Sequence, residues 1–537
     1  MKIRKRAKTL ENTVEKRRFP ALVGTLLLAA EALGCAGMLS ACSLPFIVVN
    51  DPDTKPREET GTAESETAAA VSQTETQTSV STEAPVQTGE DTDAAVPVPQ
   101  LRPEEDKETA AETYLSSLRH VNYGGTNVLI AAVGTSAVFG EDTEGASMRS
   151  DTLASYRARS LHAVEKKYNV NFITFTYTAD ELYKEVLKAY NSDTQFVSDL
   201  YFIPPRDVGR YQANGLLYNL RSLPFTDFSA PYFDTKAMRE ASAGYGIWAA
   251  SGDFTRAPEN AYAVYFNRAL YKKLGLSLPY DAVEDGTWTW DMLFENARTA
   301  CTLDGISGDN LTSFSQSEAE ELFLASSGLH PAAARIDSVP TVKPNASRMQ
   351  TIADCIFNNV MKGTTSVSSD AEQLFADGKL LYCVSTLSHV TEWADVRADW
   401  GILPLPKCYD GQSAYYTYQG GNCVLCVPSV TATPEMTGVL IQALFASSYG
   451  SHIDAYLDDV LRYYARDGRS VDMLEMITQS YYTDFSAMFA SGYPNLSAAT
   501  TGALHRTLTT VSGFEAVLRQ TQTAAQNEMA AAFPVED

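Results

Sequence analysis

The sequence predicts an α/β fold that begins with a mostly parallel sheet covered by helices on both faces. Apolar or β-branched runs at 127–133, 170–177 and 196–203 predict three strands. Amphipathic helices are expected between them, the first capped near Asp151 and the second capped by Thr178. Because strands and helices alternate with short loops, right-handed crossovers and parallel pairing follow. The 537 residues leave room for two or more domains.

The chain continues with more strands and then becomes helical. A strand at 261–267 leads into a short helix that Gly275 ends. Thr289 has the position of a helix N-cap, with Asp291 in the first turn. Further extended segments are predicted at 380–385, 401–406, 415–418 and 421–428. The remainder has helical periodicity to its end.

The first 41 residues have the pattern of an export signal. A basic stretch precedes an apolar segment over 19–41. This segment ends in Leu39-Ser40-Ala41-Cys42, which is similar to the lipobox of bacterial lipoproteins. The similarity implies cleavage before Cys42 and a lipid on its thiol, which would anchor the protein at the outer face of the cytoplasmic membrane. An uncleaved membrane span is the alternative, and Glu31 within the apolar segment disfavours it.

Residues 42–120 are predicted to form a disordered tether. They consist mainly of Thr, Ser, Glu, Ala and Pro, and such a composition cannot bury enough apolar surface to fold. Of the 55 aromatic residues, only Phe19, Phe46 and Tyr114 precede residue 120. The globular part is therefore expected over 121–537.

Charge and cysteine content restrict the class of protein. The net charge of −24 argues against nucleic acid as a partner. Six cysteines lie in the globular part, too few for a disulfide scaffold in a chain of this length. Cys423 and Cys426 have the spacing of a redox or metal motif, but their apolar surroundings favour a buried strand. The disulfide state stays open for Cys301, Cys355, Cys383, Cys408, Cys423 and Cys426.

The predicted parallel sheet indicates where a ligand binds. In such sheets ligands bind beyond the carboxyl ends of the strands. Here those ends lead to Thr135, to Phe139, to Tyr177 and to the turn that contains Arg206. We therefore expect Thr135 and Arg206 to contribute to a binding site.

A series of short motifs then resembles a known family. In order along the chain they are VYFNRALYKKLGL (264–276), WTWDM (288–292), FADGKLL (375–381), PLP (404–406) and VPSV (427–430). With the lipobox and tether before them, they resemble extracellular solute-binding proteins of the maltose-binding type. Residues 466–477 resemble a segment near the end of one branch of that family. One departure is the segment 427–430, which lacks the family's basic loop residue.

The resemblance implies a two-lobed periplasmic-binding-protein-like fold of the class II type, with the ligand closed between the lobes. It places lobe 1 at about 121–262 and 427–470, and lobe 2 at about 266–420 and 471–537. The crossing segments are expected near 262–267, 420–427 and 469–472. The implied function is capture of a sugar or oligosaccharide and its delivery to the permease subunits of an ABC transporter.

Aromatic and polar residues near the expected crossings are the candidates for ligand contact. Sugar sites stack aromatic rings on apolar sugar faces and fix hydroxyls with polar side chains. Trp248 and Asp253 precede the first crossing, and Trp393 follows the strand at 380–385. Tyr415 and Tyr418 precede the second crossing. Each of these aromatic residues could instead belong to the core, and Asp253 could be a solvated loop acid.

Two other classes of protein stay open. A lipid-anchored glycoside hydrolase would need a pair of carboxylates, and no pair stands out by its local context. The six histidines are scattered and no HExxH, GxSxG or nucleotide-binding loop is present. A binding protein that presents its ligand to a membrane sensor has the same sequence features as a transport protein. We expect a monomeric, non-catalytic protein without cofactor or metal.

Overall fold

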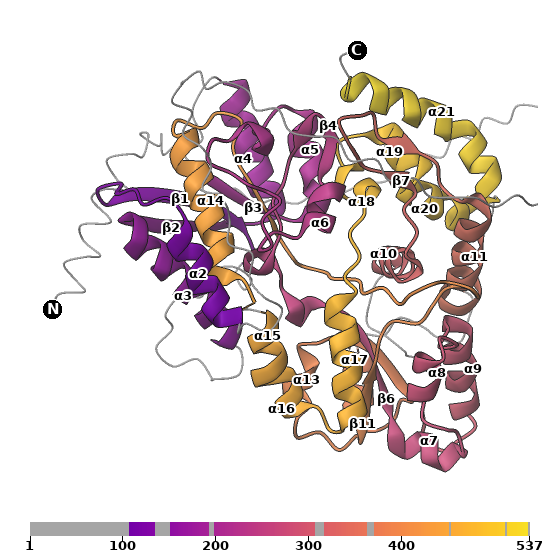
Figure 1. Cartoon of the computed structure of the whole chain (residues 1–537). Coiled ribbons are helices and arrows are strands. Elements are labelled where there is room, and N and C mark those ends of the chain that lie inside the picture. Colours follow the sequence, from indigo (N-terminus) through magenta and orange to yellow (C-terminus); the bar gives the residue numbers. More distant parts are fainter. Residues whose placement is uncertain are drawn as a thin grey trace, which may run out of the picture. The chain divides into compact units, whose positions relative to one another are not determined.

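The computed structural model describes residues 107–134, 151–192, 198–306, 316–361, 370–450, 453–510 and 513–534 (Figure 1). These residues all belong to one unit, Glu90–Asp537. The predicted signal, Cys42, most of the tether, Thr135 and Phe139 lie outside them. Among the helices in the described ranges, none is both long and apolar enough to cross a membrane.

Lobe 1 is built on a four-stranded sheet in the order β12-β3-β1-β2. Its strands are β1 (Thr126–Val133), β2 (Val170–Tyr177), β3 (Leu200–Ile203) and β12 (Val424–Cys426). β1 pairs in parallel with β2 and β3, whereas β12 pairs antiparallel with β3. The predicted parallel βαβαβ unit is therefore confirmed, and a strand from far along the chain completes the sheet.

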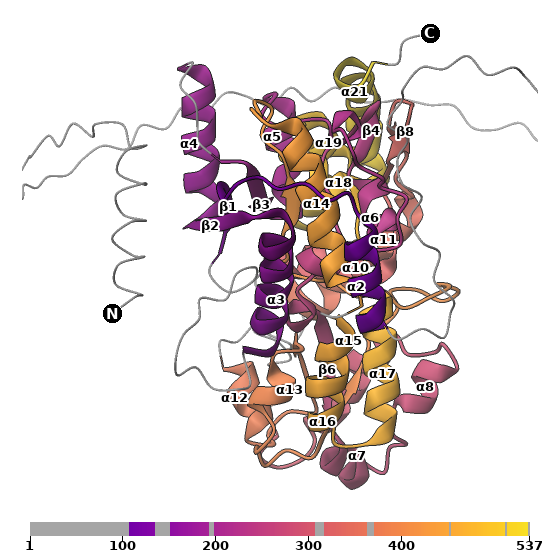
Figure 2. The same ribbon diagram turned by 60° about the vertical axis from the view of Figure 1, so that its left-hand side comes forward.

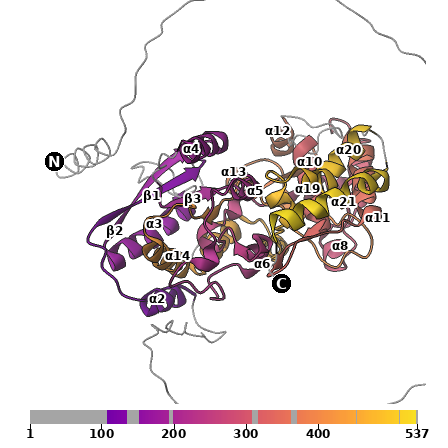
Figure 3. The ribbon, with the colours of Figure 1, turned by 90° about the horizontal axis from the view of Figure 1, so that it is seen from above.

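Both faces of this sheet are buried. Alternate residues enter different cores, so that in β3 Phe202 packs on one face and Tyr201 on the other. Figure 3 shows α4 on one side of the strands and α3, α14 and α2 on the other. Cys423, just before β12, and Cys426 within it are buried, as the sequence predicted, and both are free thiols, which the sequence left open. The helices of lobe 1 are α2 (Lys107–Ser117), α3 (Asp151–Tyr168), α4 (Ala179–Asn191), α5 (Val208–Ala213), α6 (Thr235–Glu240), α14 (Pro434–Ser448), α18 (Phe485–Phe489) and α19 (Pro494–Ala499).

The prediction that the tether extends to residue 120 is wrong. Residues 107–117 form helix α2, whose Ala110, Ala111 and Tyr114 are buried. The Tyr114 ring packs edge-on against Tyr232 and Tyr449 at 5.5 and 5.4 Å between ring centroids. A polar helix with so few apolar residues gives little sequence signal, and its packing on lobe 1 stabilises it.

Lobe 2 is built on an antiparallel sheet in the order β10-β6-β11. Its strands are β6 (Tyr262–Asn267), β10 (Tyr382–Thr386) and β11 (Trp400–Leu403). Val264 and Phe266 face one core and Ala263 and Tyr265 the other, so this sheet is also buried on both faces. The two sheets occupy separate parts of the ribbon (Figures 1 and 2). The helices of lobe 2 are α7 (Arg268–Leu274), α8 (Tyr280–Glu284), α9 (Trp290–Ala300), α10 (Gln316–Ser327), α11 (Ala346–Ile356), α12 (Ala371–Ala376), α13 (His389–Glu392), α15 (Ile453–Ala455), α16 (Arg462–Tyr464), α17 (Gly468–Gln479) and α20 (Thr501–Thr510).

Smaller elements complete the chain. Helix α21 (Phe514–Ala532) packs against both lobes, with its first half in the core of lobe 2 and its second half in that of lobe 1. Two small sheets, β5-β4-β8 and β7-β9, lie outside the main ones. Their strands are β4 (Ser242–Gly244), β5 (Gly246–Ile247), β7 (Ala332–Ala333), β8 (Arg335–Ile336) and β9 (Thr341–Val342). The predicted strand at 415–418 forms only isolated bridges.

Local signals in the sequence set the helix ends as expected. The Thr178 side chain accepts a hydrogen bond from the backbone of Glu181, whose side chain bonds back to Thr178 in a capping box. Gly275 ends α7 in the left-handed conformation, with φ of 67°. Thr289 caps α9 by accepting a hydrogen bond from the Met292 amide.

Three of the segments that join the lobes hydrogen-bond to one another. The Tyr262 amide donates to the Tyr418 carbonyl at 2.9 Å, which links the first crossing to the second. Thr417 exchanges backbone hydrogen bonds with Ser480 and Tyr482, at 2.8 and 2.9 Å, which links the second to the third. The three segments therefore form a hinge of paired extended chains, in which the pairing consists of isolated bridges and not of a continuous sheet.

The third crossing differs from the expected one. Residues 469–472 lie inside α17, which packs in lobe 2. The chain enters lobe 2 between α14 and α15 and returns to lobe 1 at 480–483, the segment called the third crossing here. The segments after α14 also differ from the expected division. Residues 456–477 enter the core of lobe 2, and α18 and α19 enter the core of lobe 1. Helical periodicity shows that one face of a helix is buried but not which lobe buries it.

Candidate functional site

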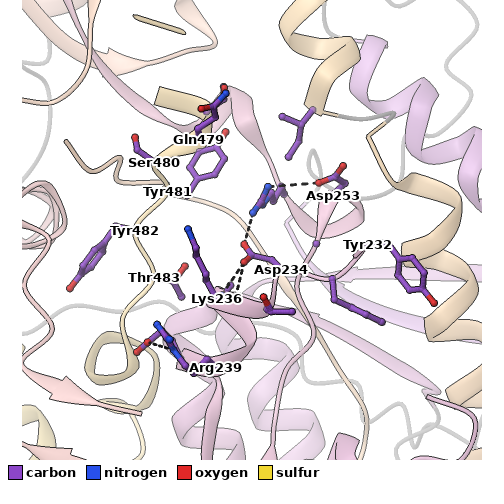
Figure 4. A pocket seen from close by; sticks show the side chains of 18 of the residues that line it. Tyr232, Asp234, Lys236, Arg239, Asp253, Gln479, Ser480, Tyr481, Tyr482 and Thr483 are labelled. Atoms are coloured by element: carbon purple, nitrogen blue, oxygen red, sulfur yellow. Dashed lines mark hydrogen bonds and ion pairs between the residues drawn. The ribbon is translucent and has the colours of Figure 1, made fainter. Parts of the chain in front are cut away.

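A pocket of about 700 Å³ lies beside the third crossing segment (Figure 4). Its walls come from α6 and the residues before it, from 252–256, from His330, from 414–416, from 449–450 and 453–457, and from 478–483. This volume lies within the range of about 300–1,000 Å³ that small-molecule sites occupy. Both lobes and the hinge therefore contribute to the pocket.

Arg256 is the central charge in the pocket wall. Its guanidinium donates to Asp234 and lies 3.8 Å from Asp253, and its side chain is 25% exposed. It also lies over the Tyr481 ring, at 5.4 Å from the centroid. The Arg256 carbonyl accepts a hydrogen bond from the buried Arg157 of α3. These contacts hold the segment 253–256 against the N-terminal end of α6, which Asp234 caps, and against the third crossing.

Arg256 holds the Asp234 carboxylate beside it in the charged form. Burial alone would raise the pKa of Asp234, but Arg256 and the backbone amides of Lys236 and Ala237 outweigh burial and lower it. Burial alone would likewise lower the pKa of Arg256, and the two carboxylates outweigh burial and raise it. Asp253 also accepts a hydrogen bond of 2.7 Å from the Gly450 amide. The group is therefore an ion-pair network at neutral pH.

Tyrosines supply the aromatic surface of the pocket. Tyr415, Tyr416, Tyr481 and Tyr482 all line it. The hydroxyl of Tyr481 is buried and has no hydrogen-bond partner among the described residues. Figure 4 shows Lys236 projecting from α6 into the same space. Rings, a hydroxyl and both signs of charge can together bind a polar organic molecule.

A second group of residues, here called the Arg206 cluster, consists of Tyr262, Glu321 and Tyr418 in contact, and of the exposed Arg206, whose charge acts on Tyr418. The Tyr418 hydroxyl donates to Glu321 at 2.5 Å, and its ring lies 5.4 Å from that of Tyr262. Burial and the Glu321 carboxylate raise the pKa of Tyr418, and the positive charge of Arg206 opposes that rise. Arg206 lies in the turn after β3, at the carboxyl end of a parallel strand.

The structure separates the residues that the sequence suggested for ligand contact. Tyr415 and Asp253 line the pocket, whereas Arg206 and Tyr418 lie in the Arg206 cluster. Trp393 is only 5% exposed in the core of lobe 2, where its ring packs on Tyr265 and Phe375 at 4.8 and 5.0 Å. The structure therefore gives Trp393 a packing role, because apolar neighbours surround it.

Trp248 is half-buried against a core of lobe 1 and is not among the residues that line the pocket. Its indole N–H is buried and finds no hydrogen-bond acceptor within the described ranges. The indole ring packs closely against Gly246. A Cβ atom added to Gly246 would lie only 2.4 Å from the nearest carbon of the ring. The glycine thus allows the ring to pack against the backbone, and ligand contact by Trp248 stays a hypothesis.

Sequence reasoning missed Arg256, Tyr481, Tyr262 and Glu321. The pair Tyr481-Tyr482 directly follows a helical pattern, which was the available signal for a crossing segment. Arg256 had no such signal, because its hydrogen-bonded partner Asp234 becomes a neighbour only through the fold, although Asp253 lies three residues before it. Another group outside the sequence predictions, Glu240, His330 and Asp484, has the composition of a possible metal site.

Comparison with protein families assigns the chain. The family model described as "Bacterial extracellular solute-binding protein" matches residues 160–449. The chain belongs to this family. Membership gives the protein a solute-binding role in ABC transport and a place outside the cytoplasm. The matched residues include β2, β3, the whole sheet of lobe 2 and α14.

Solved structures with low identity also match this solute-binding protein. The GacH receptor of Streptomyces glaucescens GLA.O, studied with acarbose, is 13% identical, with 75% of this chain and 98% of that chain covered and a TM-score of 0.48. A cyclic α-maltosyl-1,6-maltose binding protein from Arthrobacter globiformis is 14% identical, with coverage of 76% and 100% and a TM-score of 0.49. UgpB from Mycobacterium tuberculosis, solved with glycerophosphocholine, is 16% identical, with coverage of 76% and 99% and a TM-score of 0.45. No curated protein sequence matches the chain.

Proposed function

We propose that the protein captures a sugar or oligosaccharide and delivers it to an ABC permease. In this proposal a lipid on Cys42 holds the protein at the outer face of the cytoplasmic membrane, as the lipobox-like sequence at 39–42 suggests. Family membership supports solute binding, and the choice of a carbohydrate depends on the chemistry between the lobes. The protein acts as a monomer without cofactor.

The observation that carries the proposal is the Arg206 cluster. Arg206 comes from lobe 1, Glu321 from lobe 2, and Tyr262 and Tyr418 from two crossing segments. The cluster lies at the carboxyl end of β3, where ligands of parallel sheets bind. Tyrosine rings stack on apolar sugar faces, and charged side chains form strong hydrogen bonds with hydroxyls.

A solute at this cluster would touch both lobes. The lobes then close around it to the extent that the closed form binds the solute more tightly than the open form does. The paired crossing segments are the elements about which such a movement would occur.

The test measures sugar affinity for the full-length protein and for two matched tyrosine variants. A panel of disaccharides and oligosaccharides is screened by calorimetry, and the sugar that binds is used throughout. Tyr418→Ala is expected to weaken binding by about 5- to 150-fold, as for a central aromatic contact worth about 1–3 kcal/mol. Tyr481→Ala, also on a crossing segment, is the control and should change affinity by less than about threefold.

Two results would contradict the proposal. If Tyr481→Ala abolishes binding while Tyr418→Ala does not, the solute binds in the pocket of Figure 4 instead. If no sugar in the panel binds, the carbohydrate assignment is wrong. Binding without uptake in a strain that carries the neighbouring permease would favour presentation to a sensor.

A glycoside hydrolase is the alternative in a different class. Such an enzyme needs one carboxylic acid that stays protonated near neutral pH. Asp234 does not fit this role because its pKa is lowered, whereas burial raises the pKa of Glu240, which also lines the pocket. The solute-binding proposal predicts that bound sugar is recovered intact after long incubation. New reducing ends in proportion to protein concentration would show hydrolysis.

A further inference from the structure

Three ligand-type side chains from separate segments meet beside the pocket, which two of them, Glu240 and His330, line. Glu240 ends α6, His330 follows α10, and Asp484 precedes α18 at the end of the third crossing. The Nδ1 atom of His330 lies 3.4 Å from Oδ1 of Asp484 and 3.9 Å from Oε2 of Glu240. One ligand atom from each residue lies within 4.8 Å of the other two.

The two carboxylates are largely buried beside a single imidazole. The Asp484 side chain is 0% exposed and that of Glu240 10%, whereas the His330 side chain is 41% exposed. Oδ1 of Asp484 is buried, accepts no hydrogen bond from the described residues, and has the His330 ring as its nearest charged partner. Burying two carboxylates against one imidazole is costly, because each unpaired charge loses its hydration.

Asp484 has one oxygen held by hydrogen bonds and one directed toward the group, whereas both oxygens of Glu240 have a partner. Asp484 uses Oδ2 to cap α18 by accepting hydrogen bonds from the Ala487 amide and the Ser486 hydroxyl. Glu240 has Oε1 3.6 Å from the exposed Arg239, and its Oε2 accepts a hydrogen bond of 3.2 Å from the Phe485 amide. Oδ1 of Asp484 therefore remains directed at the space between the three side chains.

We infer that Glu240, His330 and Asp484 bind a divalent first-row transition-metal ion such as Zn²⁺. Ligands about 2.0–2.1 Å from zinc in tetrahedral geometry are separated by about 3.3–3.4 Å. The 3.4 and 3.9 Å separations from His330 need only a small contraction to reach that geometry, and the three ligand atoms all lie within 4.8 Å of one another. The imidazole makes a transition metal a better fit than Mg²⁺ or Ca²⁺, which prefer oxygen ligands.

The site would keep at least one open coordination position. Three protein ligands leave the fourth position of zinc to water or to a bound molecule. Because Glu240 and His330 both line the pocket, that position faces the pocket. The ring of Tyr482, 5.2 Å from the His330 ring, limits how far the imidazole can turn away. This inference does not depend on where the sugar binds.

The test titrates Zn²⁺, and separately Mn²⁺, into full-length protein that has been treated with a chelator and dialysed. Calorimetry should show one ion bound per chain, and Co²⁺ should give a visible absorption band typical of a bound ion. His330→Gln and Asp484→Asn should each weaken Zn²⁺ binding by at least about tenfold. Loss of a residue that merely supports a metal ligand already weakens binding by about 10- to 100-fold. Both variants should fold, since His330 is partly exposed and asparagine can still cap α18.

The matched control is His505→Gln. His505 also lies beside a carboxylate, at 3.0 Å from Glu320, but the described residues place no third ligand there. This variant should bind Zn²⁺ as the parent does, and unchanged far-ultraviolet circular dichroism should verify the fold of all variants. The inference is overturned if the parent shows no saturable binding of Zn²⁺ or Mn²⁺. It is also overturned if His330→Gln binds as tightly as the parent, which would assign the ion to other groups such as the cysteines.

Discussion

Replacing Arg256 by Met tests how the pocket wall is held together. Methionine has a similar length and can keep part of the contact with Tyr481, but it removes the charge between Asp234 and Asp253. Asp234, with a side chain 16% exposed, then becomes a largely buried carboxylate without its ion pair. The expected result is a clear loss of stability.

The size of the stability loss depends on the hydrogen bonds that Asp234 and Asp253 keep in the variant. Removing one partner of a buried ion pair costs about 3–5 kcal/mol. Asp234 retains hydrogen bonds of 3.1 Å from the amides of Lys236 and Ala237, and Asp253 retains the one from Gly450. The loss should therefore fall at the lower end, at about 3 kcal/mol. Arg256→Lys keeps the charge but cannot reach both acids in the same fork geometry, so an intermediate loss is expected.

The pH dependence provides a second readout. In the folded protein the pKa of Asp234 lies below its ordinary value, so its ion pair stabilises the fold above the unfolded pKa of about 3.9. This contribution is lost as the pH falls through the lowered, folded pKa. The difference in free energy of unfolding between parent and Arg256→Met should thus be full near pH 7 and shrink below about pH 4.

The assay is urea unfolding followed by circular dichroism at pH 7 and at pH 3, for the parent and both variants. A loss below about 1 kcal/mol at pH 7 would show that the network contributes no more than an exposed ion pair does. A loss of equal size at both pH values would show that the destabilisation comes from packing and not from the carboxylates.

Two further predictions concern a core residue and the anchor. Trp393→Ala should lower the free energy of unfolding by about 3–5 kcal/mol, as for a tryptophan in an apolar core. Its sugar affinity, measured well below the melting temperature, should be unchanged. A weakened affinity in a stable variant would show that Trp393 belongs to the binding site. Cys42→Ala should abolish labelling by a fatty acid and leave an uncleaved precursor, and labelling that persists would rule out the lipobox.

The local parts of the fold were accessible from the sequence. The strands at 127–133 and 170–177, the cap Thr178, the helix end at Gly275 and the cap Thr289 depend on neighbouring residues alone. Alternation of period two or 3.6 and the chemistry of caps act over a few residues, so a linear pattern contains them. The buried thiols of β12 were predicted in the same way, from an apolar run.

The parts that the sequence left open depend on contacts between distant residues. Nothing local distinguishes α2 from a tether, because its stability comes from Tyr114 packing on Tyr232 and Tyr449. The position of the third crossing depended on which lobe buries α17. From the sequence, Trp393 could have been a residue that stacks on a ligand or a core residue, since an indole ring suits both roles. Its neighbours in the folded chain make it a core residue.

The site itself was decided by tertiary structure for the same reason. Arg206 and Tyr418 were suggested by strand ends and crossing motifs, but Glu321 became their neighbour only when α10 packed in lobe 2. The group of Glu240, His330 and Asp484 is separated by up to 244 residues in sequence and 4.8 Å in space. The pattern of residues determines the local structure. Which charged side chains become neighbours depends on burial, and only the folded chain determines burial.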